Sequence, residues 1–560
     1  MKRRVLVVVC ALALIISMFS SCSKADDKDT SNADTKNSTE KTDDAESMDN
    51  GEVTEPSDAE PGWKGDTSPV TLTWWLDANW YARTWGESTV SQYITEKTGV
   101  SIEFVVPSGD PNEALTLMMV GGGELPDILS VGFWETNYKK LQEEGFVYAL
   151  DDLAEQYDPY FFKAVDPALL NWNRLEDGNV YVLPNEAYTQ KGMEETGATN
   201  ANQTFLVRKD LYEDMGSPDM RTPEGFIAAL QLLQDEYSTY KDQEIIPFYA
   251  QAASANGCYG LEEFLQNLLA IPYEVDGKIY DRYTDAEYIR WLKAIREAVS
   301  KGLITMDFYV DTADQVNEKY NNASYFCMLS EWTAMAAANT FLYNNNPDAV
   351  YIAVDGPSNS NLDPAAIFPG SMTGWLPVMI SKDCSDPERA IKFLTYWASE
   401  EGQKDFFLGE KGVTWDTIDG KDQILPEILE ILNTDPDKFE NEIGATDTYW
   451  MLRDPCMVAQ WRPEKIEPIA QNQEWANAHA DYSGGMYKLL TPEADSEEGI
   501  INAQITSAWG QTLPMLINAQ TEEEFDALWN DFIEQRESLG FDKLEAFRQM
   551  KLEEFKVKLQ

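Results

Sequence analysis

The chain has 560 residues, 43% of them hydrophobic and 12% aromatic, which is the composition of a well-packed globular protein too long for one core. Its 97 acidic and 43 basic residues give a formal net charge of −54 at pH 7. This charge excludes nucleic acid as a partner, because nucleic acid is bound through Lys and Arg, and it disfavours docking on an anionic membrane surface. A charged small ligand stays compatible with it, because a local site can oppose the field of the whole protein.

The start of the chain is typical of an exported protein. Basic residues at positions 2–4 precede an apolar run over residues 5–18, which is shorter than the roughly 20 residues of a membrane-spanning helix. The pattern predicts a secretory signal peptide over residues 1–21, and an uncleaved anchor helix is the alternative. Residues 18–22 (MFSSC) resemble the lipobox of bacterial lipoproteins. That resemblance implies acylation of Cys22, for example with palmitate, and a chain anchored on the outer face of the cytoplasmic membrane.

Residues 22–68 differ in composition from everything that follows. They are rich in Asp, Glu, Lys, Ser, Thr and Asn and nearly lack large apolar side chains before Trp63. Such a segment buries too little surface to offset its ordering entropy. We therefore expect a disordered acidic tether between the lipid anchor and the folded body.

The next residues alternate between strand and helix patterns. Residues 70–76 and 100–106 alternate apolar and polar side chains with the period of two that strands have, and residues 88–98 between them read as a helix. A helical pattern over residues 112–120 and a short apolar run over residues 127–131 follow. This order predicts an α/β lobe with a parallel sheet.

Capping signals at the first residues predict further helices. Thr284 and Ser385 each precede a Glu by three residues, as in a capping box, and Thr222 stands before a proline. The region from about Thr521 onward reads as amphipathic helix.

Six segments, in order, resemble the family 1 extracellular solute-binding proteins, in the subgroup of about this length. The resemblance spans nearly all of the chain from Val70 to its end. The segments are TEKTGVSIEF (95–104), GGGELPDILSV (121–131), GNVYVLP (178–184), FLVRKDLYEDMGSPDMRTPEGF (205–226), EYIRWLKAIREAVSKGLITMDF (287–308) and PVMISKDCSDPERAIKFLTYWASEEGQ (377–403).

The resemblance implies a two-lobed α/β fold of the periplasmic-binding-protein type, with hinge crossovers and a helical C-terminal region. Lobe 1 would hold residues 69–185 and about 356–403, and lobe 2 about 204–355 and 404–560. The hinge candidates are residues near 184–204 and 355–368.

Aromatic and polar residues that follow strands are the candidates for a ligand site, together with Trp375, which follows the glycine turn of residues 370–374. Ligands of open α/β sheets lie beyond the carboxyl ends of strands, and sugar rings offer apolar faces to flat aromatic side chains. Trp332 also occupies the place where the resemblance puts a cleft tryptophan in sugar-binding members. The ligand-binding candidates are Asn79, Trp80, Tyr81, Trp134, Ser254, Asn256, Tyr259, Trp332 and Trp375. By contrast, strand position or helical spacing predicts core packing for Trp74, Trp75, Trp291, Trp397 and Trp529.

Cysteines and histidine indicate no metal centre. Besides Cys22 the mature chain keeps four scattered cysteines, whose pairing the sequence leaves open, and one histidine, which we expect at the surface rather than in a catalytic triad. We expect no cofactor, no metal and no catalytic residue. The cysteines and the histidine are Cys258, Cys327, Cys384, Cys456 and His479.

The resemblance implies a monomeric, non-enzymatic binding protein that delivers a small ligand, by expectation an oligosaccharide, to the permease subunits of an ABC importer. A peptide or another solute on the same fold is one alternative. A second is an anchored carbohydrate-active enzyme, because the 97 acidic residues neither name nor exclude a catalytic carboxylate pair. A calcium-stabilised adhesin is a third, and no calcium-loop motif supports it.

Overall fold

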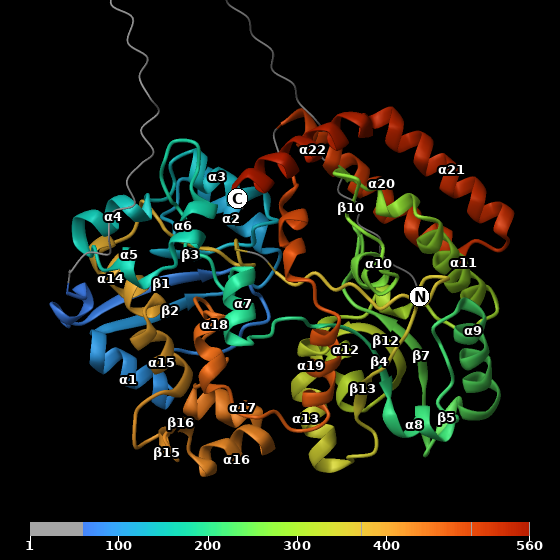
Figure 1. Ribbon diagram of the computed structural model, residues 1–560, viewed down its shortest axis with the longest axis horizontal. Coiled ribbons are helices and arrows are strands. Elements are labelled where there is room, and N and C mark those ends of the chain that lie inside the picture. The colour runs from blue at the N-terminus through green and yellow to red at the C-terminus, as the bar shows by residue number, and fades with distance from the viewer. Residues whose placement is uncertain (1–59, 371, 494–495, 559–560) are drawn as a thin grey trace, which may run out of the picture. The chain divides into compact units, whose positions relative to one another are not determined.

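Two four-stranded sheets organise the computed structural model, which describes residues 60–370, 372–493 and 496–558 (Figure 1). In the first sheet, of order β14-β3-β1-β2, strands β1, β2 and β3 are parallel and β14 is antiparallel. In the second, of order β13-β4-β12-β7, strand β7 is parallel to β12 and β4 is antiparallel to both β12 and β13. We call each sheet with the helices packed on it a lobe. The strands are β1 (Val70–Leu76), β2 (Val100–Val105), β3 (Ile128–Ser130), β14 (Val378–Ile380), β4 (Gln203–Arg208), β7 (Ile246–Ala250), β12 (Tyr325–Glu331) and β13 (Tyr351–Ala353).

Helices cover both sheets, as the predicted α/β class requires. The first lobe carries α1 (Thr89–Thr98), α2 (Pro111–Gly121), α3 (Thr136–Glu143), α4 (Leu150–Tyr157), α5 (Phe161–Ala164), α6 (Pro167–Asn173), α14 (Pro387–Ala398), α15 (Glu400–Leu408), α16 (Pro426–Thr434), α17 (Pro436–Lys438) and α18 (Pro455–Val458). The second carries α8 (Lys209–Asp214), α9 (Pro223–Leu232), α10 (Leu265–Leu268), α11 (Ala286–Ser300), α12 (Ala313–Asn321), α13 (Ala336–Asn345), α19 (Ile469–Ala478), α20 (Glu497–Asn518), α21 (Glu522–Leu539) and α22 (Phe541–Lys558). Within the described part of the chain, no helix has the length and apolar character to span a membrane.

Two of the predicted helix starts are found at the expected residue, and two others lie one residue later in the chain. Thr222 and Thr521 cap α9 and α21 through their side chains, as expected. The cap of α11 is Asp285 rather than Thr284, because Thr284 belongs to a preceding 3₁₀ turn. Asp386 rather than Ser385 caps α14. In each case the residue with a side-chain oxygen next to the first helical turn makes the capping bond.

The two central tryptophans of β1 lie in different cores, because successive strand residues point to opposite faces. Trp74 packs with Trp397 of α14 on one face, and Trp75 packs with Leu129 on the other. Trp291 and Trp529 lie in the core of the second lobe. The core assignments made for these tryptophans are therefore confirmed.

The chain passes between the lobes three times. The first crossover follows Leu183, which bridges to β14, and ends at β4. It contains the short helix α7 (Gln190–Thr196). The second runs from β13 back to β14, and the third, residues 462–468, connects the first-lobe core to α19. The first two crossovers contain the predicted hinge residues 184–204 and 355–368, whereas the third was not predicted from the sequence.

At two places the packing differs from the domain boundaries that the sequence predicts. Trp63 is buried against Tyr160 and Tyr396 of the first lobe, so the folded body begins before the expected end of the tether at residue 68. Residues 406–452 contribute Phe406 and Trp450 to the same core, although we expected everything after residue 403 in the second lobe. The predicted signal peptide, Cys22 and the tether up to residue 59 lie outside the described residues.

Candidate functional site

Both lobes carry aromatic and polar residues at the carboxyl ends of their parallel strands, where ligands of α/β sheets lie. In the first lobe the exposed residues Asn79 and Trp80 follow β1, and Trp134 follows β3. In the second lobe Gln251 follows β7 and Trp332 follows β12. The two strand edges are the basis of the candidate site.

Three indoles form one stack in the first lobe. Trp375 and Trp450 lie with ring centroids 4.6 Å apart and planes inclined by 28°. Trp80 stacks near both of them, at 6.5 Å from Trp375 and 5.7 Å from Trp450. Trp80 is 61% exposed whereas Trp450 is 8% exposed. We call these three residues the indole platform, an aromatic surface that is anchored in the core and open at one end.

An asparagine of the first crossover and a glycine of the second hold Trp375 in place. The side-chain Oδ1 of Asn185 accepts hydrogen bonds from the backbone N–H groups of Trp375, at 3.0 Å, and of Leu376, at 2.7 Å. Gly374 has a φ of +71°, and a Cβ there would lie 1.9 Å from the carbonyl oxygen of Asn185. Only glycine tolerates both conditions, so the turn before Trp375 depends on it.

Tyr81, a predicted ligand contact, lies beneath the platform. Its ring stands edge-on to Trp450 at 6.0 Å, and its hydroxyl donates to the carbonyl of Thr448 at 3.3 Å. Burial raises the pKa of Tyr81 well above its ordinary value. Tyr81 therefore supports Trp450 from behind, while Trp80 presents the open indole.

Trp134 lies on the same sheet edge but outside the platform. It is 50% exposed and packs against Phe133, and the Cβ of any larger residue at Gly132 would lie 2.7 Å from its ring. Beside it, burial and the neighbouring charge of Asp77 raise the pKa of Glu135 to about 7.

The raised pKa of Glu135 predicts that the stability of the folded protein depends on pH. Because its folded-state pKa lies above its ordinary value of 4.5, its stabilising contribution is complete below about pH 4.5 and is lost as the pH rises through about 7. We expect Glu135→Gln to raise the melting temperature relative to the wild type at pH 8 and to leave it nearly unchanged at pH 4. Thermal unfolding of both proteins across this range measures the difference. Glu155→Gln, at an exposed position of α4, is the control, and an equal shift at both pH values would contradict the prediction.

The candidates of the second lobe are not in contact with the platform within the described residues. Trp332 is only 7% exposed, donates to the carbonyl of Ala201 at 2.9 Å, and has the ammonium of Lys465 over its ring at 5.3 Å. Ser254 and Asn256 are exposed in the hairpin of β8 (Ala253–Ser254) and β9 (Gly257–Cys258), which packs on α20.

Tyr259 belongs to a polar cluster that the sequence analysis did not find. Burial, followed by the charges of Glu263 and Glu331, raises its pKa well above the ordinary value. Glu263 pairs with Lys488 at 2.7 Å and accepts from Gln203 at 2.9 Å. Because Gln203 opens β4 and Glu331 closes the antiparallel β12, they meet at one edge of the sheet.

An ion network lies next to the platform and was also missed. Arg453 pairs with Glu186 at 2.5 Å and with Asp447, and Arg462 donates to Asp447 at 3.0 Å. Glu186 follows the asparagine that holds Trp375, and Asp447 precedes Trp450 by three residues. The network and the platform are thus built on the same two chain segments.

Among the described residues, the cysteines and the histidine form neither a disulfide nor a metal-binding group. The four cysteines that follow Cys22 in the sequence are all free, and three of them are buried. No group of His, Cys, Asp and Glu suited to a metal ion occurs among residues 60–370, 372–493 and 496–558. His479 is half-buried, lies against Trp475 with the ring centroids 4.3 Å apart and the planes inclined by 35°, and bonds to the carbonyl oxygen of Trp475.

Two α/β lobes, three crossovers and aromatic strand edges define a ligand-binding fold of the hinged, two-lobed class. The family model described as bacterial extracellular solute-binding protein matches residues 84–404, more than half of the chain. The chain belongs to this family, whose members bind solutes outside the cell. The predicted family resemblance is confirmed.

Solved structures show the same fold at low sequence identity. The substrate-binding protein FusA of Streptococcus pneumoniae, in complex with kestose, is 15% identical, with a TM-score of 0.66 over 87% of this chain and 100% of that one. The alginate-binding protein AlgQ2 is 17% identical, with a TM-score of 0.61 over 86% and 98% of the two chains. A solute-binding protein described as binding HMO, from Bifidobacterium longum infantis, is 16% identical, with a TM-score of 0.60 over 87% and 99%. Comparison with curated protein sequences found no significant match.

Proposed function

We propose that this protein captures an oligosaccharide outside the cell and delivers it to the permease of an ABC importer. The observation that carries the proposal is the indole platform of Trp80, Trp375 and Trp450, whose open end offers a flat apolar surface of the kind that covers a sugar ring. The fold-related proteins that are described with kestose or HMO support the same ligand class. The other candidate contacts, Asn79, Trp134, Ser254, Asn256, Tyr259 and Trp332, stay proposals at the two strand edges.

Capture proceeds by closure of the lobes about the crossovers, with residues 184–204 and 355–368 as hinges. Affinity then depends on the free energy of the closed state relative to the open state. The protein acts as a monomer and carries out no chemistry on its ligand. A peptide or other solute is the alternative cargo, and an anchored carbohydrate-active enzyme is the alternative function.

The test is a ligand screen on the chain from Ser23 to Gln560, which keeps Trp63 in its core. A ligand at a hundredfold excess over its dissociation constant stabilises the fold by about 2.7 kcal/mol, which raises the melting temperature measurably. We expect a rise with one oligosaccharide of a plant and host panel, and the same sugar recovered intact after incubation. Recovery of cleaved sugar would indicate the enzyme, and a rise only with peptides would replace the proposed cargo.

The proposal includes a lipid anchor at Cys22, supported by the lipobox-like residues 18–22. Two acyl chains would hold the protein firmly on the outer face of the cytoplasmic membrane. We expect the full-length protein in the membrane fraction with incorporated palmitate, and Cys22→Ala without the label. Equal labelling of both proteins would contradict acylation at this residue.

A further inference from the structure

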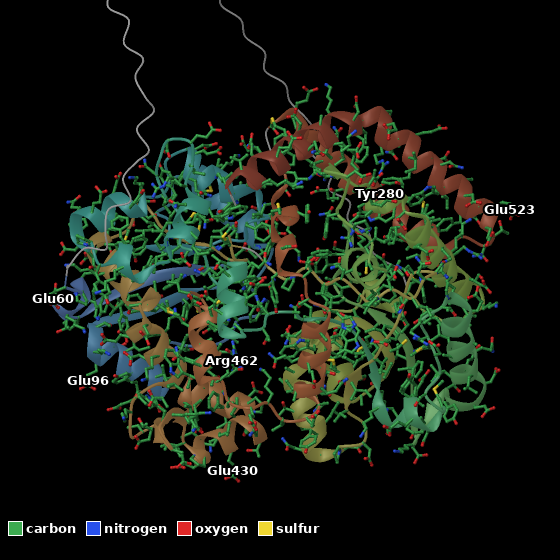
Figure 2. The ribbon with its side chains drawn as sticks, in the orientation of Figure 1. Glu60, Glu96, Tyr280, Glu430, Arg462 and Glu523 are labelled. Atoms are coloured by element: carbon green, nitrogen blue, oxygen red, sulfur yellow. The ribbon has the colours of Figure 1, made fainter. Side chains whose placement is uncertain are left out.

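The C-terminal helix α22 is anchored in the second lobe. It packs on α20, on α21 and on the short strand β11 (Lys278–Ile279), which precedes the Tyr280 labelled in Figure 2. The side chain of Gln549 accepts a hydrogen bond from the backbone of β11 at 2.9 Å. Further along, the ammonium group of Lys556 pairs with the carboxylate of Glu274 at 2.6 Å. These contacts hold α22 on the second lobe along most of its length.

The last turn of α22 also contacts the first lobe, at α6 (Figure 1). The ring of Phe555 lies against the indole of Trp172, with the ring centroids 5.0 Å apart and the planes inclined by 33°. The ammonium group of Lys558 donates to the carbonyl oxygens of Trp172, at 3.4 Å, and of Arg174, at 3.3 Å, where α6 ends. Carbonyls at the end of a helix lack partners within the helix, so a lysine there is a suitable donor. Phe555 and Lys558 thus connect a helix of the second lobe to the first lobe.

The same part of α6 holds the turn that carries the platform residue Trp375. The indole Nε1 of Trp172 donates to the hydroxyl of Thr373 at 2.8 Å, and the side-chain amide of Asn173 donates to the carbonyl oxygen of Met372 at 3.1 Å. Trp172 and Thr373 are only 7% and 5% exposed. Breaking their hydrogen bond would leave a buried donor without a partner, which is costly. The position of Trp172 therefore fixes the backbone two residues before Trp375.

The turn depends on such contacts from outside, because its central residue is a glycine. Gly374 has a φ of +71°, and glycine has more conformational freedom than any other residue. Asn185 holds the backbone after Gly374, through the amide of Trp375, and Trp172 holds the backbone before it, through Thr373. A displacement of Trp172 would therefore be passed to Trp375 through a single side chain and a short piece of backbone.

We propose that Phe555 is a positioning residue for the ligand. By packing on Trp172, it keeps the turn of residues 372–375 in place and with it the indole of Trp375 in the platform. Phe555 does not touch the ligand. The inference rests on the proposed function and deepens it, because it makes the binding surface of the first lobe depend on the C-terminal helix of the second.

Hydrogen exchange in the absence of sugar tests the positioning directly. The amides of Trp375 and Leu376 donate to the buried side chain of Asn185, so they are protected while the turn is in place. We expect Phe555→Ala to speed their exchange at least about tenfold, and Phe555→Tyr, which retains the ring, to restore the wild-type rate. The matched control is Phe547→Ala, at a half-buried position of the same helix, and it should leave this exchange unchanged.

Calorimetry with the oligosaccharide that the screen identifies measures the effect on the ligand. We expect Phe555→Ala to weaken binding at least about fivefold, whereas Phe555→Tyr and Phe547→Ala bind as the wild type does. Thr373→Val removes the hydroxyl that accepts from Trp172. If Phe555 acts through this hydrogen bond, the double variant Phe555→Ala/Thr373→Val binds no more weakly than the weaker of the two single variants, because residues that act through one link are not additive.

The outcomes that overturn the inference differ from those that overturn the proposed function. Unchanged exchange in Phe555→Ala would show that Phe555 does not hold the turn. Multiplying effects in the double variant would show that it does not act through Thr373. Faster exchange with unchanged sugar affinity would remove the role in ligand binding and leave the proposed function standing. A wild type that binds no oligosaccharide would remove the proposed function and this role together, whatever the exchange rates.

Discussion

Replacing Trp80 by alanine is expected to weaken oligosaccharide binding about 30-fold, which corresponds to about 2 kcal/mol. The indole is 61% exposed and stacks on Trp375 and Trp450, so it supplies the open end of the platform rather than part of the core. The melting temperature of the free protein should therefore change little. Isothermal titration with the sugar from the screen, together with thermal unfolding of the free protein, measures both effects.

An exposed aromatic residue elsewhere provides the control for this variant. Phe341 lies on α13 and is also largely exposed, so Phe341→Ala removes comparable apolar surface without touching the platform. We expect its affinity to equal that of the wild type. Equal affinities for Trp80→Ala and the wild type would mean that the sugar does not lie on the platform.

Gly374→Ala is expected to damage the platform from behind. An alanine at φ +71° costs about 1–2 kcal/mol, and its Cβ would collide with the backbone of Asn185. The chain must shift to relieve this contact, and the shift moves Trp375 away from the hydrogen bonds that place it. We therefore expect a lower melting temperature together with a loss of sugar affinity of at least about tenfold.

The same turn supplies the matched control. Gly370 meets no atom within 4 Å of a Cβ and has no positive φ, so Gly370→Ala should retain both stability and affinity. If Gly374→Ala lowers the melting temperature but binds sugar as well as the wild type does, the turn is structural only and Trp375 does not serve the ligand.

Local sequence patterns were enough to predict the first strands of the first sheet and the helix between them. The alternation in β1 and β2 and the glycine that ends α1 are signals carried by neighbouring residues, and the structure has these elements within one or two residues of the prediction. The helix caps at Asp285 and Asp386 moved by one residue, because the sequence offers two adjacent capping side chains at each place.

The candidate site was predicted only in part, for a geometric reason. Position after a strand indicated Trp80, position after the glycine turn of residues 370–374 indicated Trp375, and both lie in the platform. The same argument indicated Tyr81 and Trp332, which are mostly buried, because strand order does not tell which way a side chain beyond the strand turns. Trp450 follows no strand, so the argument could not find it.

The sequence by itself determined the α/β class, the family and the core tryptophans, because periodicity, caps and motif order are properties of neighbouring residues. Only the tertiary structure decided which distant residues meet. Trp80, Trp375 and Trp450, and likewise Glu186, Asp447 and Arg462, come together through crossovers and irregular segments. Contacts of this kind depend on how long loops close, and no local pattern records them.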